Sequence, residues 1–210
     1  MIENYTDIGA TTAEAMQIST KSRKLISELI GDKSIEDRIR QRCVIATGDP
    51  AVAYILSFQH NPVEAGLRAL QKGAPIYVDI KMMQAGVVKK GHQSDVVVMI
   101  GQGDEQAEAR GITRSSAGVL ALKEKLSGSI IAIGNAPSAL LTLCDLMEAG
   151  EVLPELVIGA PVGFVNAAES HERLRKIDVP AISVVGTRGG TPIAVAALNE
   201  IINTYARNSH

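Results

Sequence analysis

The first part of the chain holds two stretches whose apolar residues recur at helical spacing. The first runs from residue 11 to 29 and is followed by Gly31, which favours a helix end. The second begins near Ser34, a good N-cap residue, and continues to Arg42. It leads into the apolar run 43–46, which breaks off in Thr47-Gly48-Asp49-Pro50. A strand or a helix ends in this way when it opens into a functional loop.

Short apolar runs and helical segments alternate along the rest of the chain. We expect a short helix after Pro50, a helix from Asn61-Pro62 to Gly73, strands within 74–80 and 96–100, and a helix from about Ser115. Three strand–turn–helix units follow, within 129–150, 155–177 and 179–206. This alternation predicts parallel strands joined by right-handed crossovers, with helices on both faces of the sheet. The expected fold class is therefore three-layer α/β, in a single domain over residues 1–210.

Composition narrows the classes of function. The formal net charge is -2, there is no long basic run, Trp is absent and aromatic residues make up 3%, so a nucleic-acid partner is not expected. We find neither the pattern of a signal peptide nor an apolar stretch of membrane-spanning length, which predicts a cytoplasmic protein with no membrane partner. Cys43 and Cys144 lie far apart in apolar surroundings, so we expect two buried free thiols and no metal site.

Four loops are candidates for function, because ligands of such sheets bind outside the carboxyl ends of the strands. The segment from Gly134 to Ser138 can offer helix N-terminal amides to an anion, or it can be only a compact turn. Segments 159–166 and 186–191 fit neither G-x-G-x-x-G nor a P-loop, and Arg188 in the latter can reach a carboxylate or lie in solvent. Segment 111–116 places Arg114 beside hydroxyls, a set suited to a carboxylate, although Ser115 can be simply a helix cap.

Histidine is the usual proton carrier near neutral pH. The chain has four, at positions 60, 92, 171 and 210, and the polar neighbours of each predict surface side chains.

Five phrases, in order along the chain, resemble the precorrin-8X methylmutase family of cobalamin biosynthesis, also called cobalt-precorrin-8 methylmutase. They are GAPIYVDIKMMQAGV, TRSSAGVLAL, AIGNAPSALLTL, VIGAPVGFVNAAES and VVGTRGGTPIAVAALN, and the similarity runs from about Tyr5 to Ile202. The resemblance implies a flavodoxin-like parallel sheet, a homodimer, and an isomerase without a separate cofactor. The implied reaction moves a methyl group from C-11 to C-12 of a corrin precursor, giving hydrogenobyrinate or its cobalt form.

The resemblance also implies a binding site for a tetrapyrrole with several carboxylate arms. The positions that it assigns to substrate binding are Ser19, Arg42, Thr47, Gly48, Asp49, Thr113, Arg114, Ser115, Asn135 and Ser138. The family has a histidine directly before its Ala-Thr/Cys-Gly motif, where it is thought to protonate or hydrogen-bond the tetrapyrrole. Here this position is Ile45, so no catalytic residue is assigned with certainty.

Three interpretations of Ile45 stay open beside that of a plain core residue. A pocket that binds the right geometry can retain some rate without a general acid, because the shift is intramolecular. Another group can supply the proton, with His60, His92 and Asp49 as candidates. The third interpretation is a protein that binds a tetrapyrrole without isomerising it. A nucleotide-binding flavodoxin-like protein is a broader alternative.

Overall fold

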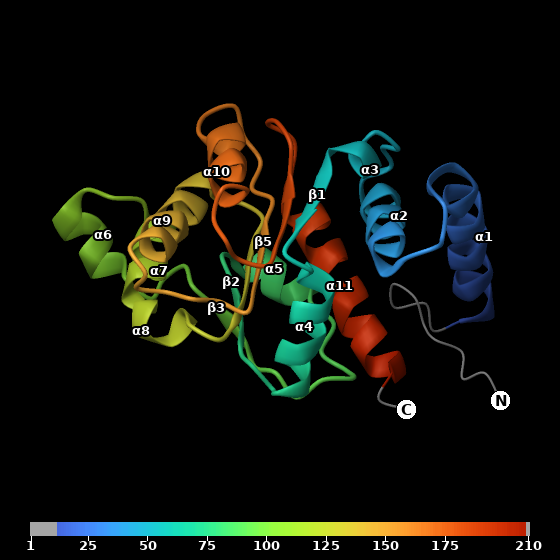
Figure 1. The fold of residues 1–210 in the computed structure, drawn as a ribbon, viewed down its shortest axis with the longest axis horizontal. Coiled ribbons are helices and arrows are strands. Elements are labelled where there is room, and N and C mark those ends of the chain that lie inside the picture. The colour runs from blue at the N-terminus through green and yellow to red at the C-terminus, as the bar shows by residue number, and fades with distance from the viewer. Residues whose placement is uncertain (1–11, 209–210) are drawn as a thin grey trace.

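A six-stranded sheet with the order β1-β6-β5-β4-β2-β3 forms the centre of the molecule (Figure 1). The computed structural model describes residues 12–208. The strands are β1 (Leu56–Gln59), β2 (Ile76–Val78), β3 (Val96–Val98), β4 (Ile130–Ile133), β5 (Leu156–Gly159) and β6 (Ala181–Val184). All neighbours are parallel except β1, which pairs antiparallel with β6. The predicted α/β class is confirmed, and without β1 the parallel strands have the flavodoxin order.

Helices cover both faces of the sheet, as predicted (Figure 1). One layer contains α2 (Ile35–Thr47), α4 (Pro62–Gln71), α5 (Lys81–Gly86) and α11 (Thr191–Asn208), with the short α3 (Val52–Ile55) before β1. The other contains α7 (Arg114–Ala121), α8 (Lys123–Leu126), α9 (Pro137–Glu148) and α10 (Ala167–Leu174), with α6 (Asp104–Arg110) against α7. Helix α1 (Ala13–Ile30) packs on α2, outside the first layer.

The two faces of the sheet have separate hydrophobic cores, and alternation along each strand explains this. In β4, Ile130 and Ala132 join the core beneath α11, while Ile131 and Ile133 join the core beneath α9. All four are fully buried. Burying an isoleucine side chain contributes about 1.5–3 kcal/mol, so this continuous apolar run is what a doubly covered strand requires.

The apolar run 43–46 turns out to be the end of a helix. Ser34 caps α2 with a capping box formed with Asp37, which confirms the predicted start. The helix continues five residues beyond Arg42 to Thr47, because Cys43 and Val44 are buried against the core. Gly48 then ends it in the left-handed conformation with φ +68°, which glycine adopts without strain.

Several features differ from the sequence prediction, including helix α5, which was not expected. Strand β1 was not predicted, because its residues Leu-Ser-Phe-Gln lack the continuous apolar run that indicated strands such as β4. Residues 104–110, for which no helix was predicted, form α6, which buries only Ala107. His171 was predicted at the surface and is fully buried in α10, so that prediction is wrong. Its polar sequence neighbours face away from the side of α10 on which His171 and Ser170 lie.

Candidate functional site

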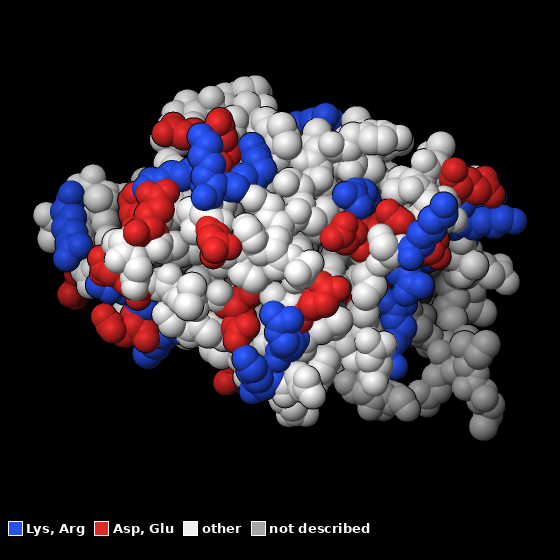
Figure 2. Space-filling view, viewed as in Figure 1, with Lys and Arg blue, Asp and Glu red and all other residues white. Residues whose placement is uncertain are grey.

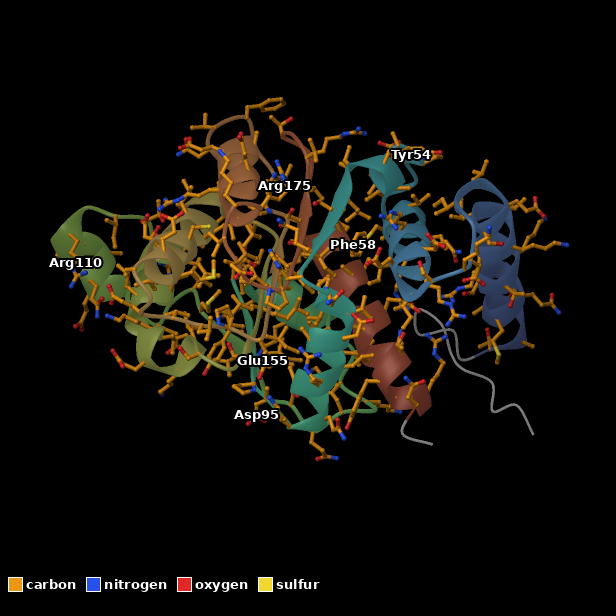
Figure 3. All side chains as sticks on the ribbon, viewed as in Figure 1. Tyr54, Phe58, Asp95, Arg110, Glu155 and Arg175 are labelled. Carbon is orange, nitrogen blue, oxygen red and sulfur yellow. The ribbon has the colours of Figure 1, made fainter. Side chains whose placement is uncertain are left out.

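The predicted site loops gather at the edge of the sheet where the parallel strands end. Strand β1 runs in the opposite direction, so the loop before it, residues 48–51, lies at this same carboxyl edge. In Figure 3, Tyr54 marks this side, whereas Asp95 and Glu155, which precede β3 and β5, lie at the other edge. The strand order reverses between β2 and β4, and folds of this kind bind ligands at such a switch point.

Asp79 follows β2 at the switch point and holds the turn after β4. Its Oδ2 accepts hydrogen bonds from the backbone N–H groups of Asn135 (2.7 Å) and Ala136 (3.1 Å). The side chain is buried, and Oδ1 has no hydrogen-bond partner among the described residues. Burial raises the pKa of the Asp79 carboxyl, although the backbone donors act in the opposite direction. Two amides of the turn before α9 are therefore already used by an internal carboxyl group.

A cluster of hydroxyl groups joins two of the predicted loops. Thr113 Oγ1 lies 2.8 Å from Ser138 Oγ and donates to Ser116 Oγ at 3.0 Å. Ser116 Oγ donates to the backbone carbonyl of Ser138 at 3.1 Å. Thr113, not Ser115, is the N-cap of α7, since its Oγ1 accepts the N–H of Ser116. The start of α7 is thus fixed against the start of α9, which brings Thr113, Arg114 and Ser138 to one place.

Arg114 leaves this cluster and binds an internal carboxylate. Its Nε and Nη2 donate to Asp104 Oδ1 (3.0 Å) and Oδ2 (2.6 Å), a bidentate pair between α7 and the start of α6. Hydrogen bonding to Arg114 holds the pKa of Asp104 below its usual range. Both side chains remain exposed to solvent.

The loop after α2 meets the loop after β6. Arg188 Nη1 donates to Asp49 Oδ2 at 2.7 Å, and Asp49 Oδ1 accepts the N–H of Ala51 at the start of α3. Thr47 stays exposed, and its hydroxyl donates to the carbonyl of Cys43 one turn back in α2. Arg188 therefore reaches a carboxylate, one of the two possibilities left open by the sequence, and this carboxylate belongs to the same chain.

The loops after β5 and β6 are tied together by backbone and by His171. Gly190 N donates to Ala160 O, and Gly163 N donates to Thr187 O. His171 Nδ1 lies 2.9 Å from Gly186 O, so this nitrogen carries a proton, whereas Nε2 has no hydrogen-bond partner among the described residues. Burial lowers the pKa of His171, which keeps the ring neutral.

Arg42 and Ser19 lie away from this group of loops. Arg42 is buried between α2 and α11, where its Nη1 binds Glu200 Oε2 at 3.0 Å. Glu200 also meets Arg207 at 2.9 Å and Arg23 of α1 at 3.6 Å. Ser19 is a half-buried residue of α1, the helix outside the first layer. Neither side chain lies on the loops that follow the parallel strands.

Ile45 is half-buried in the last turns of α2, two residues before Thr47. Two of the proposed substitute acids lie at the wrong edge of the sheet. His60 follows the end of β1, which pairs with the first residue of β6, and lies 3.2 Å from Asp178. His92 precedes β3 and contacts Val88 O and Ser94 N. Of the three candidates, only Asp49 lies among the site loops.

The described part of the chain shows no metal-binding cluster. No group of three or more His, Cys, Asp or Glu side chains within residues 12–208 could hold a metal ion. Cys43 and Cys144 are buried free thiols, as predicted, and burial raises the pKa of each to about 12.

Figure 2 shows Lys and Arg interspersed with Asp and Glu, so the face in view has no extended basic surface. None of the described helices is long and apolar enough to span a bilayer.

Comparison with known proteins agrees with the resemblance seen in the sequence. Residues 17–204 match the family described as CbiC, precorrin-8X methylmutase. A cobalt-precorrin-8 methylmutase of Methanocaldococcus jannaschii is 40% identical over 96% of this chain and 99% of its own, and one of Priestia megaterium is 37% identical over 93% and 91%. A solved precorrin-8X methylmutase of Thermus thermophilus has a TM-score of 0.83 and 34% identity, covering 91% of this chain and 97% of that one. The chain belongs to the precorrin-8X methylmutase family, a family of isomerases in cobalamin biosynthesis.

Proposed function

We propose that this protein moves a methyl group from C-11 to C-12 of precorrin-8X or cobalt-precorrin-8, giving hydrogenobyrinate or its cobalt form. The observation that carries the proposal, beside family membership, is the arrangement at the switch point. There Arg114 follows Thr113 at the start of α7, and the Thr113 hydroxyl contacts Ser138 at the start of α9, so a guanidinium and two hydroxyls come from one junction of two helices. Such a set suits the carboxylate arms of a corrin precursor.

The experiment follows conversion by the visible spectrum. Arg114→Ala should raise KM about 10-fold or more and change kcat less, because a hydrogen bond to a charged group contributes about 1.5–3 kcal/mol. The matched control is Arg110→Ala, which removes an exposed arginine at the far end of α6 (Figure 3). Equal KM values for Arg114→Ala and the unaltered protein would remove Arg114 from the binding site.

The further members of the proposed site are Ser115 and Asn135 at the switch point and Thr47, Gly48 and Asp49 beside Ile45. Arg42 and Ser19 remain predictions of the family resemblance. For Arg42 we propose an indirect contribution, because its guanidinium is engaged by buried Glu200. It would hold the end of α2, and with it Ile45, against α11.

Catalysis without a histidine at position 45 would rest on binding geometry. The methyl shift is intramolecular, so a pocket that holds the reactive tautomer can lower the barrier without a proton transfer. A general acid typically adds roughly 10²- to 10⁴-fold. Ile45→His should therefore raise kcat by at least about 10-fold if a catalytic group has been lost, with Ile45→Leu as the size-matched control. An unchanged kcat would favour a substitute acid, of which Asp49 is the remaining candidate.

The alternative function is a protein that binds a tetrapyrrole without isomerising it. Ile45 is the observation that favours this reading, because its side chain neither donates nor accepts a proton. Incubation with precorrin-8X and its cobalt form distinguishes the two: a spectral shift on binding with no conversion to hydrogenobyrinate would support the alternative.

We propose a homodimer, and α1 supplies the supporting surface. None of its 18 residues is buried, and Ile18, Leu25 and Leu29, with exposed fractions of 55–62%, lie on one helical face. Leu25→Asp should shift the molecular mass by light scattering toward the monomer. Leu153→Asp, at an exposed leucine before β5, is the control and should leave the mass unchanged. A cytoplasmic location and a single domain over residues 1–210 remain predictions.

A further inference from the structure

We infer that Asp104 and Asp49 are resident counter-ions of Arg114 and Arg188, and that substrate carboxylates displace them. The site would thereby favour ligands with at least two carboxylates over those with one. This inference rests on the proposed function, in which the ligand is a corrin precursor with several carboxylate arms.

The Asp104 carboxylate binds the Arg114 guanidinium in the way a substrate carboxylate would. Its two oxygens take two parallel hydrogen bonds from Nε and Nη2, the arrangement by which arginine recognises carboxylates. The side chains of Arg114 and Asp104 are 62% and 47% exposed, so water screens the pair. Exposed pairs contribute little to stability, and one carboxylate can therefore replace another here at small cost.

Asp104 stays beside Arg114 even when a ligand displaces it. The residue before it, Gly103, lies so close to α7 that a Cβ would meet the carbonyl oxygen of Ala117 at 2.5 Å. This contact fixes the start of α6 on the helix that begins with Arg114. A carboxylate tethered this way competes at an effective concentration of roughly millimolar or more, which a free monocarboxylate at lower concentration does not match.

Asp49 and Arg188 form a second pair of the same kind. Their side chains are 43% and 51% exposed, and the backbone N–H of Ala51 holds Asp49 in place. Arg188 follows β6, whereas Arg114 is fixed beside Ser138, which follows β4. Strand β5 lies between β6 and β4, so the two pairs flank the loop after β5. A ligand that gains from both exchanges must carry carboxylates on separate arms, and linkage of the arms supplies the affinity.

The test titrates hydrogenobyrinate, the expected product, into the protein and follows its visible spectrum. Asp104→Asn and Asp49→Asn should each lower Kd about 2- to 5-fold, the range expected when a weak exposed pair no longer competes. The double variant should lower it by about the product of the two factors, because the pairs share no residue.

The matched control is Glu148→Gln. Glu148 makes an equivalent bidentate pair with Arg173 through Nε and Nη2, at the end of α9 away from the site loops. Glu148→Gln changes the net charge by the same amount as Asp104→Asn, and the Kd for hydrogenobyrinate should stay unchanged. An equal decrease in Kd for Glu148→Gln would reduce the effect to net charge and overturn the inference.

Other outcomes separate the inference from the proposed function. A higher Kd for Asp104→Asn would mean that Asp104 positions Arg114, and would overturn the counter-ion role alone. The counter-ion role alone is also overturned if Asp104→Asn lowers Kd by the same factor in the Arg114→Ala variant as in the unaltered protein. Absence of hydrogenobyrinate binding to the unaltered protein would overturn both the inference and the proposed function.

Discussion

Arginine–carboxylate pairs occur in two contrasting regions of this molecule. Between α2 and α11, Arg42 meets Glu200 with side-chain exposures of 5% and 0%. At the carboxyl edge of the sheet, Arg114 meets Asp104 with exposures of 62% and 47%. The donor–acceptor distances are similar, at 3.0 Å for the first pair and 2.6–3.0 Å for the second.

Burial, and not distance, decides what each pair can do. A buried carboxylate has lost its hydration, so separating it from its arginines leaves an uncompensated charge in the interior. An exposed pair regains water when it opens. Arg42 is therefore committed to holding helices together, whereas Arg114 is free to exchange its partner for a ligand.

The largest effect should come from breaking the buried pair. Glu200→Gln removes the carboxylate that Arg42, Arg207 and Arg23 share, and should lower the free energy of unfolding by about 3–5 kcal/mol. Urea denaturation followed by circular dichroism measures this. Glu148→Gln, which breaks an exposed pair, is the control. A loss below about 1 kcal/mol for Glu200→Gln would place this group with the exposed pairs.

The fold was largely predictable, because its long periodic segments carry their own signals. The capping box at Ser34, the stop at Gly31 and the fully apolar run of β4 each follow from local chemistry. Strand β1 was not predictable, since Ser57 and Gln59 interrupt its apolar residues and its partner β6 lies more than a hundred residues away. Helix α6 was missed because a helix that buries one alanine has no apolar face to detect.

The candidate site was predictable as a set of loops but not as a set of contacts. Sequence reasoning identified Arg114, Arg188 and the turn at Asn135, yet each has an internal acidic partner. Asp104 and Asp79 were not singled out, and Asp49 was predicted to bind substrate and not to pair with Arg188, because an acidic residue in a loop does not indicate which cation or amide it reaches. Glu200 was missed for the same reason, since its partner Arg42 is 158 positions away.

A smaller loss is expected at Asp79, which is buried like Glu200 but binds amides and not a cation. Asp79→Ala leaves the N–H groups of Asn135 and Ala136 without their acceptor and should cost about 1–3 kcal/mol. Asp79→Asn keeps one oxygen able to accept both hydrogen bonds, so it should cost less. Thermal denaturation of both variants measures the difference, and an equal loss would show that the carboxylate charge, not the hydrogen bonds, supports the turn.

A third effect should appear only on acidification. The pKa of buried His171 is lowered, so below about pH 6.5 the unfolded chain binds a proton that the folded chain does not. Stability should therefore fall as the pH decreases from about 7.5 to 5.5, by up to about 1.4 kcal/mol for each pH unit. His171→Asn can still donate to Gly186 O and has no titrating ring. Its melting temperature should fall less over this range, and an equal fall would assign the pH dependence to other groups.

The smallest effect on stability should come from Asp104→Asn, the variant expected to change ligand binding. The pair that it weakens is exposed, and screening by water leaves little stabilisation to lose, so the melting temperature should stay within experimental error. Helix α6 should keep its place, because Gly103 still packs against Ala117. A clear decrease in the melting temperature would mean that the Arg114–Asp104 pair is structural, like Arg42–Glu200. In that case exposure would not distinguish an arginine kept for a ligand from one used by the fold.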